Sequence, residues 1–380
     1  MNNVVYMDYA AATPMDSSVL DAMRPYFAEQ FFNPSATYLP AVSVQKDVEA
    51  ARARVAHRLG VRPGEVVFTG GGTEANNLAI RGVMDQYPDG NIIMSAIEHE
   101  SVLAPAHQYT CHEALVTDQG LVDIPQLVKL IDDNTMLVSV MYANNEVGTI
   151  QPIRQIAVKL ESIRRARRQS GNTRPLYLHT DAAQAAAYLD IHAKRLGVDM
   201  MTVNGGKIYG PKGCGALFVA AHVRLSPVVL GGGQERGMRS GTENVPGIIG
   251  LATALDLVQM RRQEEAKRLS DLQGLFIKLV KDQLPQAAIN GSRKHRLPNN
   301  IHLTLPGQDN ERVLLQLEQH GILAAAGSAC SASNEEPSHV LRVMGVPDQD
   351  ARASLRFTLG HHTTEDHIRK AVHALESAVG

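Results

Sequence analysis

Short runs of consecutive apolar residues, bounded by glycine or polar positions, recur along the longer N-terminal part of the chain. The runs cover residues 66–68, 92–94, 136–140, 176–178, 200–203, 216–219 and 228–230. Continuous runs of this length are typical of strands that are buried on both faces. Helical patterns lie between several of them, at residues 43–59, 73–84 and 153–168. The alternation predicts an α/β fold in which helices cover a sheet.

The pattern changes after about residue 250. A long, charged helical pattern covers residues 251–284. Two strand-like pieces at residues 301–305 and 355–358 follow, and then a last helix at residues 364–379. The chain of 380 residues is longer than one typical domain. We therefore expect a second, smaller α+β domain in this part.

Charge and composition narrow the classes of function. The formal net charge is −2, so no overall attraction to nucleic acid or to a membrane is expected. No basic segment followed by an apolar one begins the chain, and no apolar run approaches the roughly 18–20 residues that span a bilayer. Three cysteines, Cys111, Cys214 and Cys330, are not spaced as a metal site or a disulfide framework. We expect a soluble, cytoplasmic protein.

Three glycines follow the apolar run at residues 66–68. Gly70, Gly71 and Gly72 lead into Thr73-Glu74 and a predicted helix. Such a junction presents backbone N–H groups and the positive end of a helix dipole, which suits a phosphate. A tight turn with Thr73 as the helix N-cap is an equally good interpretation. The segment does not match the dinucleotide-binding fingerprint.

Two further polar residues follow predicted buried strands. Asp181 lies after the run at 176–178, where open α/β sheets place ligands and where a carboxylate can hold a protonated pyridine nitrogen. The spacing alone favours a helix cap. Lys207 lies in a glycine-rich turn after the run at 200–203, where a lysine can bind a carbonyl cofactor covalently. The alternative is a surface turn with Lys207 and Lys212 both solvated.

Cys330 is the best candidate for a reactive thiol. Small residues flank it within residues 325–333, which lack hydrophobic periodicity and therefore read as a loop. A loop gives the exposure that a thiolate nucleophile requires. We expect Cys111 and Cys214 to be inert, because free cysteine is more often a small hydrophobic residue than a nucleophile.

The order of these motifs resembles that of the class V, fold-type I pyridoxal-phosphate enzymes of the NifS/IscS cysteine desulfurase family. The resemblance covers nearly the whole chain and is most specific at Lys207-Ile208-Tyr209-Gly210-Pro211-Lys212-Gly213, Arg239-Ser240-Gly241-Thr242 and Ser328-Ala329-Cys330. It implies a large domain, residues 16–254, around a mostly parallel seven-stranded sheet. The smaller α+β domain, residues 1–15 and 255–380, would carry the cysteine loop.

The resemblance also implies the catalytic roles. Lys207 would hold pyridoxal 5′-phosphate covalently and remove the substrate's α-proton. His99 would stack on the cofactor ring and transfer protons. Cys330 would take the sulfur of L-cysteine as a persulfide, leaving alanine. No resident metal is expected, although Cys330 would contact an iron–sulfur cluster transiently on a scaffold.

The remaining site residues follow from the same resemblance. Asp181 would pair with the ring nitrogen and Gln184 with the ring hydroxyl. The other residues expected at the cofactor are Gly72, Thr73, Asn145, Asn204, Gly206 and, from the partner subunit of a homodimer, Thr242. The residues expected at the substrate are Asn33, Asn145 and Arg356, the last as a bidentate clamp on the carboxylate.

Three positions depart from the family pattern. Gly206 stands where a histidine is usual, and Asn204 stands where a phosphate-binding serine is usual. The segment Ala36-Thr37-Tyr38 stands where the family reaches a histidine. These departures concern cofactor affinity and the proton relay. The sequence also stops at residue 380, without the tail by which longer members dock an iron–sulfur scaffold, so the sulfur acceptor stays open.

Two kinds of alternative stay open. Within the family, the chain could be a selenocysteine lyase or a lyase that releases sulfide directly, although the Gly-Ser-Ala-Cys segment favours sulfur relay. From a different class, it could be a catalytically silent relative that acts as a binding partner. Gly206 is the only support for that view, and Lys207, Asp181, His99, Cys330 and Arg356 argue against it.

Overall fold

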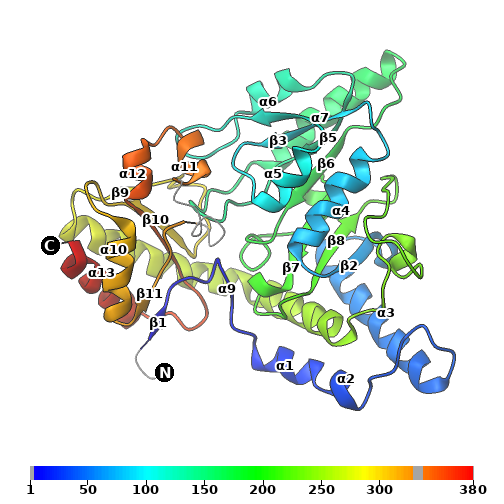
Figure 1. The fold of residues 1–380 in the computed structure, drawn as a ribbon, viewed down its shortest axis with the longest axis horizontal. Coiled ribbons are helices and arrows are strands. Elements are labelled where there is room, and N and C mark those ends of the chain that lie inside the picture. The colour runs from blue at the N-terminus through cyan, green and yellow to red at the C-terminus, as the bar shows by residue number, and fades with distance from the viewer. Residues whose placement is uncertain (1–3, 328–336, 380) are drawn as a thin grey trace.

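The computed structural model describes residues 4–327 and 337–379 (Figure 1). Its centre is a seven-stranded sheet in the order β2-β8-β7-β6-β5-β3-β4. The strands are β2 (Val66–Thr69), β3 (Asn91–Ser95), β4 (Thr110–Ala114), β5 (Thr135–Ser139), β6 (Tyr177–Asp181), β7 (Met200–Asn204) and β8 (Gly215–Val219). Only β8 runs antiparallel to its neighbours. The predicted α/β class and the mostly parallel seven-stranded sheet are therefore confirmed.

In the central sheet, one predicted strand is wrong and one real strand was missed. Residues 228–230 form no strand: Val229 makes an isolated bridge to Arg239, and Leu230 is 80% exposed. The seventh strand is β4, at the edge of the sheet, where Ala114 is its one buried residue. An edge strand with solvated faces can carry polar side chains, so no continuous apolar run marks it.

The other strands are buried on both faces, which explains their continuous apolar runs. Along β3, Ile92 and Met94 pack with α4 (Gly72–Met84) and α5 (Glu100–Ala106). Ile93, which points to the opposite face, packs in a second core. Helices α3 (Leu39–Leu59), α7 (Ile153–Gln169) and α9 (Val245–Gln283) contribute to that core.

The second lobe contains a three-stranded sheet in the order β12-β10-β9 (Figure 1). Its elements are β9 (Ala288–Ile289), β10 (Asn300–Thr304), β12 (Ser354–Thr358), α10 (Asn310–Gln319) and α13 (Glu365–Val379). The strands and last helix predicted after residue 250 are thus present. The 39-residue helix α9 runs without a break through the expected boundary at 254/255, which stays a prediction.

The N-terminal segment connects the two lobes. Its strand β1 (Val5–Tyr6) pairs in parallel with β11 (Ile322–Leu323) of the second lobe. Farther along, Thr358 N donates to Met7 O at 2.7 Å, and Thr13 N donates to Gly206 O at 3.1 Å. Residues 7–13 therefore pass from β12 to the turn after β7, where Lys207 lies.

Shorter helices complete the described chain. They are α1 (Ser17–Met23), α2 (Pro25–Ala28), α6 (Ile124–Leu130), α8 (Ala193–Leu196), α11 (His339–Val343) and α12 (Asp348–Arg352), with single 3₁₀ turns at Pro63–Glu65, Gly205–Lys207 and Glu235–Gly237. None of the helices in the described ranges combines the length and apolar character that a bilayer span requires.

Candidate active site

Lys207 lies directly after β7, at the end of the 3₁₀ turn Gly205–Lys207. Its Nζ donates to Ala10 O at 2.8 Å and to Ala11 O at 2.6 Å, so the N-terminal segment covers it. The alternative of a solvated surface lysine is therefore wrong for Lys207. Lys212 is exposed, although its Nζ donates to Thr13 O at 2.8 Å.

Asp181 ends β6, the strand beside β7, and is 7% exposed. Its Oδ1 accepts from Ala183 N at 2.8 Å, so it does cap the following turn. Its Oδ2 accepts from Asn76 Nδ2 at 2.7 Å. Three residues on, Gln184 Nε2 donates to Ala10 O at 3.0 Å, the same carbonyl that Lys207 contacts. The structure thus gathers Lys207 and Gln184 at one carbonyl near the carboxyl ends of β6 and β7.

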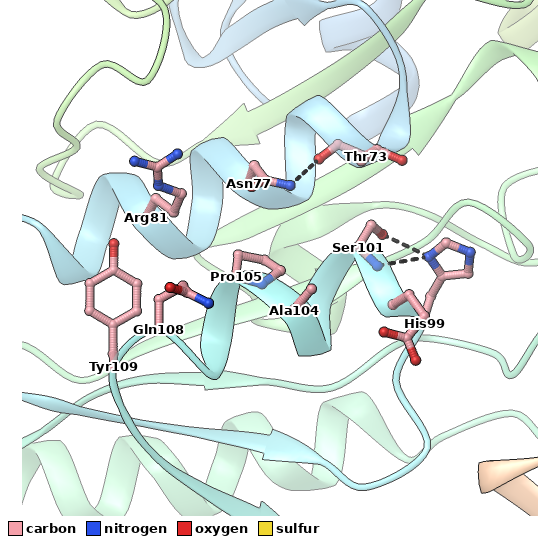
Figure 2. A pocket seen from close by; sticks show the side chains of 10 residues that line it. Thr73, Asn77, Arg81, His99, Ser101, Ala104, Pro105, Gln108 and Tyr109 are labelled. Atoms are coloured by element: carbon pink, nitrogen blue, oxygen red, sulfur yellow. Dashed lines mark hydrogen bonds between the residues drawn. The ribbon is translucent and has the colours of Figure 1, made fainter. Parts of the chain in front are cut away.

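His99 is the N-cap of α5, and its Nδ1 accepts from Ser101 N at 3.1 Å (Figure 2). Ser101 Oγ lies 2.9 Å from the same nitrogen. Because Nδ1 accepts a backbone N–H, the proton of the neutral ring is assigned to Nε2. A cavity of about 660 Å³ between α4 and α5 is lined by both His99 and Thr73, so these two predicted residues share one space.

The glycine turn is built as a helix N-terminus. Helix α4 begins at Gly72, and its N-cap is Gly71 at φ 143°. The alternative that Thr73 is the N-cap is therefore wrong. A Cβ on Gly72 would lie 3.3 Å from Asn204 Nδ2, whereas Asn204 Oδ1 accepts from Gly206 N at 3.2 Å. The amide of Asn204 thus presents its nitrogen toward the start of α4, where donors suit a phosphate.

Gly206 does not have a left-handed backbone, and a Cβ there would have ordinary contacts, with Lys212 Cγ at 3.4 Å. The departure from histidine at this position is thus not forced by the local backbone.

Arg356 and Asn145 lie together at the junction of the lobes. Arg356 is 2% exposed, and its Nη1 donates to Asn145 O at 3.1 Å. Its Nη2 pairs with Asp8 Oδ1 at 2.7 Å, whereas Nε has no partner among the described residues. The sequence reasoning gave Asp8 no role. No periodicity marks it, because its partner lies 348 positions away.

Other predicted residues lie apart or outside the described ranges. Asn33 is exposed, and its Oδ1 accepts from Ser35 N at 2.9 Å within its own turn. Thr242 is exposed as well. Cys330 falls in residues 328–336, outside the described residues. Ala325, at the start of the predicted cysteine loop, pairs with Arg356 across an antiparallel bridge.

The loop that carries Thr242 is anchored by a buried ion pair. Arg52 Nη1 and Nη2 contact the two carboxylate oxygens of Glu235 at 2.7 and 2.8 Å. Glu235 and Arg236 both adopt positive φ, 48° and 58°, which non-glycine residues rarely do. Farther along, Arg239 Nε donates to Glu74 Oε1 at 2.9 Å, which joins the loop to the first turn of α4.

Burial shifts the pKa of two ionisable neighbours of Asp181. Burial, with the charge of Asp181 adding to it, raises the pKa of Glu98 well above its usual range. Burial lowers the pKa of His179 to about 4. His179 also contacts Ser139 Oγ and Thr202 Oγ1, at 2.9 and 3.1 Å, as a structural histidine does.

Burial disfavours the thiolate form of both described cysteines. Burial raises the pKa of Cys214 to about 12, and burial with the nearby Glu113 raises the pKa of Cys111. Within the part of the chain that the structure describes, no group of three or more His, Cys, Asp or Glu residues could hold a metal ion.

A lysine after β7, a carboxylate ending β6 and a glycine turn opening α4 on this sheet form the arrangement expected of a class V, fold-type I enzyme. The family model for class-V aminotransferases matches residues 5–370, and the chain belongs to this family. It is 38% identical over 386 residues to cysteine desulfurase IscS of Dictyoglomus turgidum, covering 100% of this chain and 95% of the relative.

Solved structures agree with this assignment. A NifS-like protein superposes with a TM-score of 0.90 at 30% identity and covers 98% of each chain. The structure described as SspA in complex with cysteine has a TM-score of 0.80 at 33% identity and covers 93% of this chain and 98% of its own. The predicted resemblance to NifS/IscS-type class V enzymes is confirmed.

Proposed function

We propose that this protein is a pyridoxal 5′-phosphate-dependent cysteine desulfurase. It converts L-cysteine to L-alanine and holds the sulfur as a persulfide on Cys330. The observation that carries the proposal is the placement of Lys207 after β7 and of Asp181 at the end of the neighbouring strand β6, with Gln184 sharing an acceptor with Lys207. Relatives named cysteine desulfurase over the full chain length give further support.

The residues present fit the cofactor. Lys207 would hold it covalently, Asp181 would face its ring nitrogen and Gln184 its ring hydroxyl. The N–H groups at Gly72 and Thr73, with Asn204 Nδ2, form a donor set that suits a phosphate. When bound, the cofactor acts as an electron sink for the substrate's α-carbon.

The chain's own groups handle the substrate. Arg356 is a buried cation whose Nε has no partner among the described residues, and it would bind the cysteine carboxylate, with Asn145 and Asn33 orienting the amino acid. Lys207 would take the α-proton, and His99 would move protons at the ring face. Gly206 completes the turn in which Lys207 is held.

The sulfur step is assigned to Cys330. Its thiolate would attack the substrate sulfur, so that an S–S bond forms as the Cβ–S bond breaks and alanine leaves. The raised pKa values of Cys111 and Cys214 support this choice. The persulfide would pass to an acceptor protein such as an iron–sulfur scaffold. We place the reaction in the cytoplasm and in a homodimer, with Thr242 of the partner subunit at the phosphate.

The test is a stoichiometry on the purified protein loaded with cofactor. We expect L-cysteine to yield alanine, and borohydride reduction to fix the cofactor on Lys207, found by peptide mass spectrometry. Lys207→Ala should release no alanine, and Lys212→Ala should keep its cofactor label. Label on Lys212, or no alanine from the wild type, would overturn the proposal.

A further inference from the structure

A chain of hydrogen bonds joins His99 to Asp181 through two buried side chains. Asn76 Nδ2, on α4, donates to Asp181 Oδ2 at 2.7 Å and to Ser101 Oγ at 2.8 Å. Ser101 Oγ lies 2.9 Å from His99 Nδ1 (Figure 2). Asn76 is 0% exposed and Ser101 is 8% exposed, so the two linking side chains are shielded from solvent.

The orientation of the Asn76 amide follows from its neighbour. An ionised carboxylate only accepts, so the amide nitrogen must face Asp181. Both of its hydrogens are then used, and Asn76 Oδ1 has no partner among the described residues. A buried amide oxygen without a partner lowers stability, and an apolar side chain would avoid that loss. The Asn76 amide therefore supplies two hydrogen bonds to the site while lowering the stability of the fold.

The direction of donation continues to the imidazole. Ser101 Oγ accepts from Asn76, so its own hydrogen is free to point to His99 Nδ1, which also accepts from Ser101 N at 3.1 Å. Two donors on Nδ1 exclude a proton there and hold the tautomer with the proton on Nε2. A perturbation at Ser101 can therefore reach Asp181 through one intervening side chain.

We propose that Asn76 and Ser101 are positioning residues that hold His99 and Asp181 as one hydrogen-bonded unit. His99 is thereby kept as the Nε2–H tautomer, and the Asp181 carboxylate is kept in a fixed orientation. This inference rests on the proposed function, because that function places the cofactor ring between these two side chains. A substitution that moves Asn76 or Ser101 should then affect both His99 at the ring face and Asp181 at the ring nitrogen.

The test uses the cofactor-loaded protein with Ser101→Ala, Asn76→Leu and the double variant. The first readout needs no substrate: it is the pH midpoint of the cofactor's visible absorption change. We expect each single variant to move this midpoint in the same direction, by about half a pH unit or more. The double variant should move it no further than the larger single one, because both substitutions break the same chain.

The second readout is steady-state turnover of L-cysteine. We expect Ser101→Ala to lower kcat about 10-fold while KM changes less than about 2-fold. The reason is that Arg356, the proposed substrate clamp, takes no part in the series of hydrogen bonds from His99 to Asp181. Ser101→Thr, which restores the hydroxyl, should recover kcat and the midpoint. Ser162→Ala, which removes an exposed hydroxyl bonded to Val158 O on α7, should match the wild type.

The outcomes separate this inference from the proposed function. No alanine from the wild type would overturn the function itself. Normal wild-type turnover with an unchanged midpoint and kcat in Ser101→Ala would overturn the positioning role alone. Additive midpoint shifts in the double variant, or no recovery in Ser101→Thr, would also overturn it. If Asn76→Leu does not fold, the Ser101→Ala and Ser101→Thr pair carries the test.

Discussion

At the scale of single residues, the three cysteines should behave differently. Cys330→Ser replaces the proposed sulfur nucleophile with a hydroxyl that is hardly ionised at neutral pH. The variant should bind cofactor and change its spectrum with cysteine, yet carry no persulfide and release little or no sulfide. Persulfide is detected as an adduct of about 32 Da by mass spectrometry.

The matched controls are Cys111→Ser and Cys214→Ser, which should keep near-normal turnover because burial raises both pKa values. Sustained sulfide release from Cys330→Ser would instead indicate direct C–S lysis and would move the protein out of the desulfurase class.

The raised pKa of Glu98 makes the stability of the folded protein depend on pH. Its raised pKa means that the folded protein binds this proton more tightly than the unfolded chain. The stabilisation is complete below the ordinary pKa of 4.5 and is lost as pH rises toward the raised value. Glu98→Gln keeps the oxygen that accepts from Met141 N and removes the titration.

From pH 5 to 8, the variant's free energy of unfolding should therefore rise relative to wild type, by up to about 1.4 kcal/mol per pH unit. Urea unfolding at each pH measures this difference. A difference that does not change with pH would contradict the expectation.

At the scale of elements, the buried ion pair between α3 and the loop at residues 231–242 should hold that loop. Arg52→Ala leaves the Glu235 carboxylate buried, 3% exposed at its side chain, without the guanidinium that contacts both of its oxygens. Breaking one half of a buried pair costs about 3–5 kcal/mol. The Arg52→Ala variant should also retain less cofactor, because the loop carries Thr242, the proposed phosphate ligand, and Arg239, which joins the loop to α4.

Denaturant unfolding and retained cofactor after gel filtration measure the two effects. Arg165→Ala is the control, because Arg165 is 71% exposed and its surface pair with Glu161 is worth at most about 1 kcal/mol. Equal losses of stability in the two variants would contradict the expectation that breaking the buried Arg52–Glu235 pair costs more than breaking a surface pair.

Elements also show what the sequence could and could not predict. Strands buried on both faces carry continuous apolar runs, so β3, β5, β6 and β7 were found, and Asp181 and Lys207 were found with the runs of β6 and β7. Edge strand β4 lacks that pattern and was missed. One sequence signal could have indicated Asn76 as a site residue: it is a polar residue on the apolar face of α4, beside Ala75 and Ala79. No sequence signal indicates the pairing of Asp8 with Arg356, because this pairing depends on how the two lobes contact each other.

At the scale of the whole molecule, we expect a homodimer whose active sites need both subunits. Thr242 is exposed in the single chain and is therefore available to a second copy. Thr242→Ala should weaken cofactor retention by about 1.5–3 kcal/mol, the value of a hydrogen bond to a charged group.

Sedimentation and cofactor-binding titration are the measurements for this prediction. A monomer that keeps full activity, or a Thr242→Ala variant that binds cofactor as tightly as wild type, would contradict it.

The segment over Lys207 has a consequence for synthesis on the ribosome. Residues 7–13 are made first, yet Met7 pairs with Thr358 and Val5 with Ile322, near the end of translation. At roughly 5–20 residues per second, the early segment waits about 20–70 s for those partners. The central sheet can form in that interval, but Val5 and Met7 lack their partners until β11 and β12 emerge. A chain released by a premature stop before β11 should therefore keep these N-terminal residues unpaired.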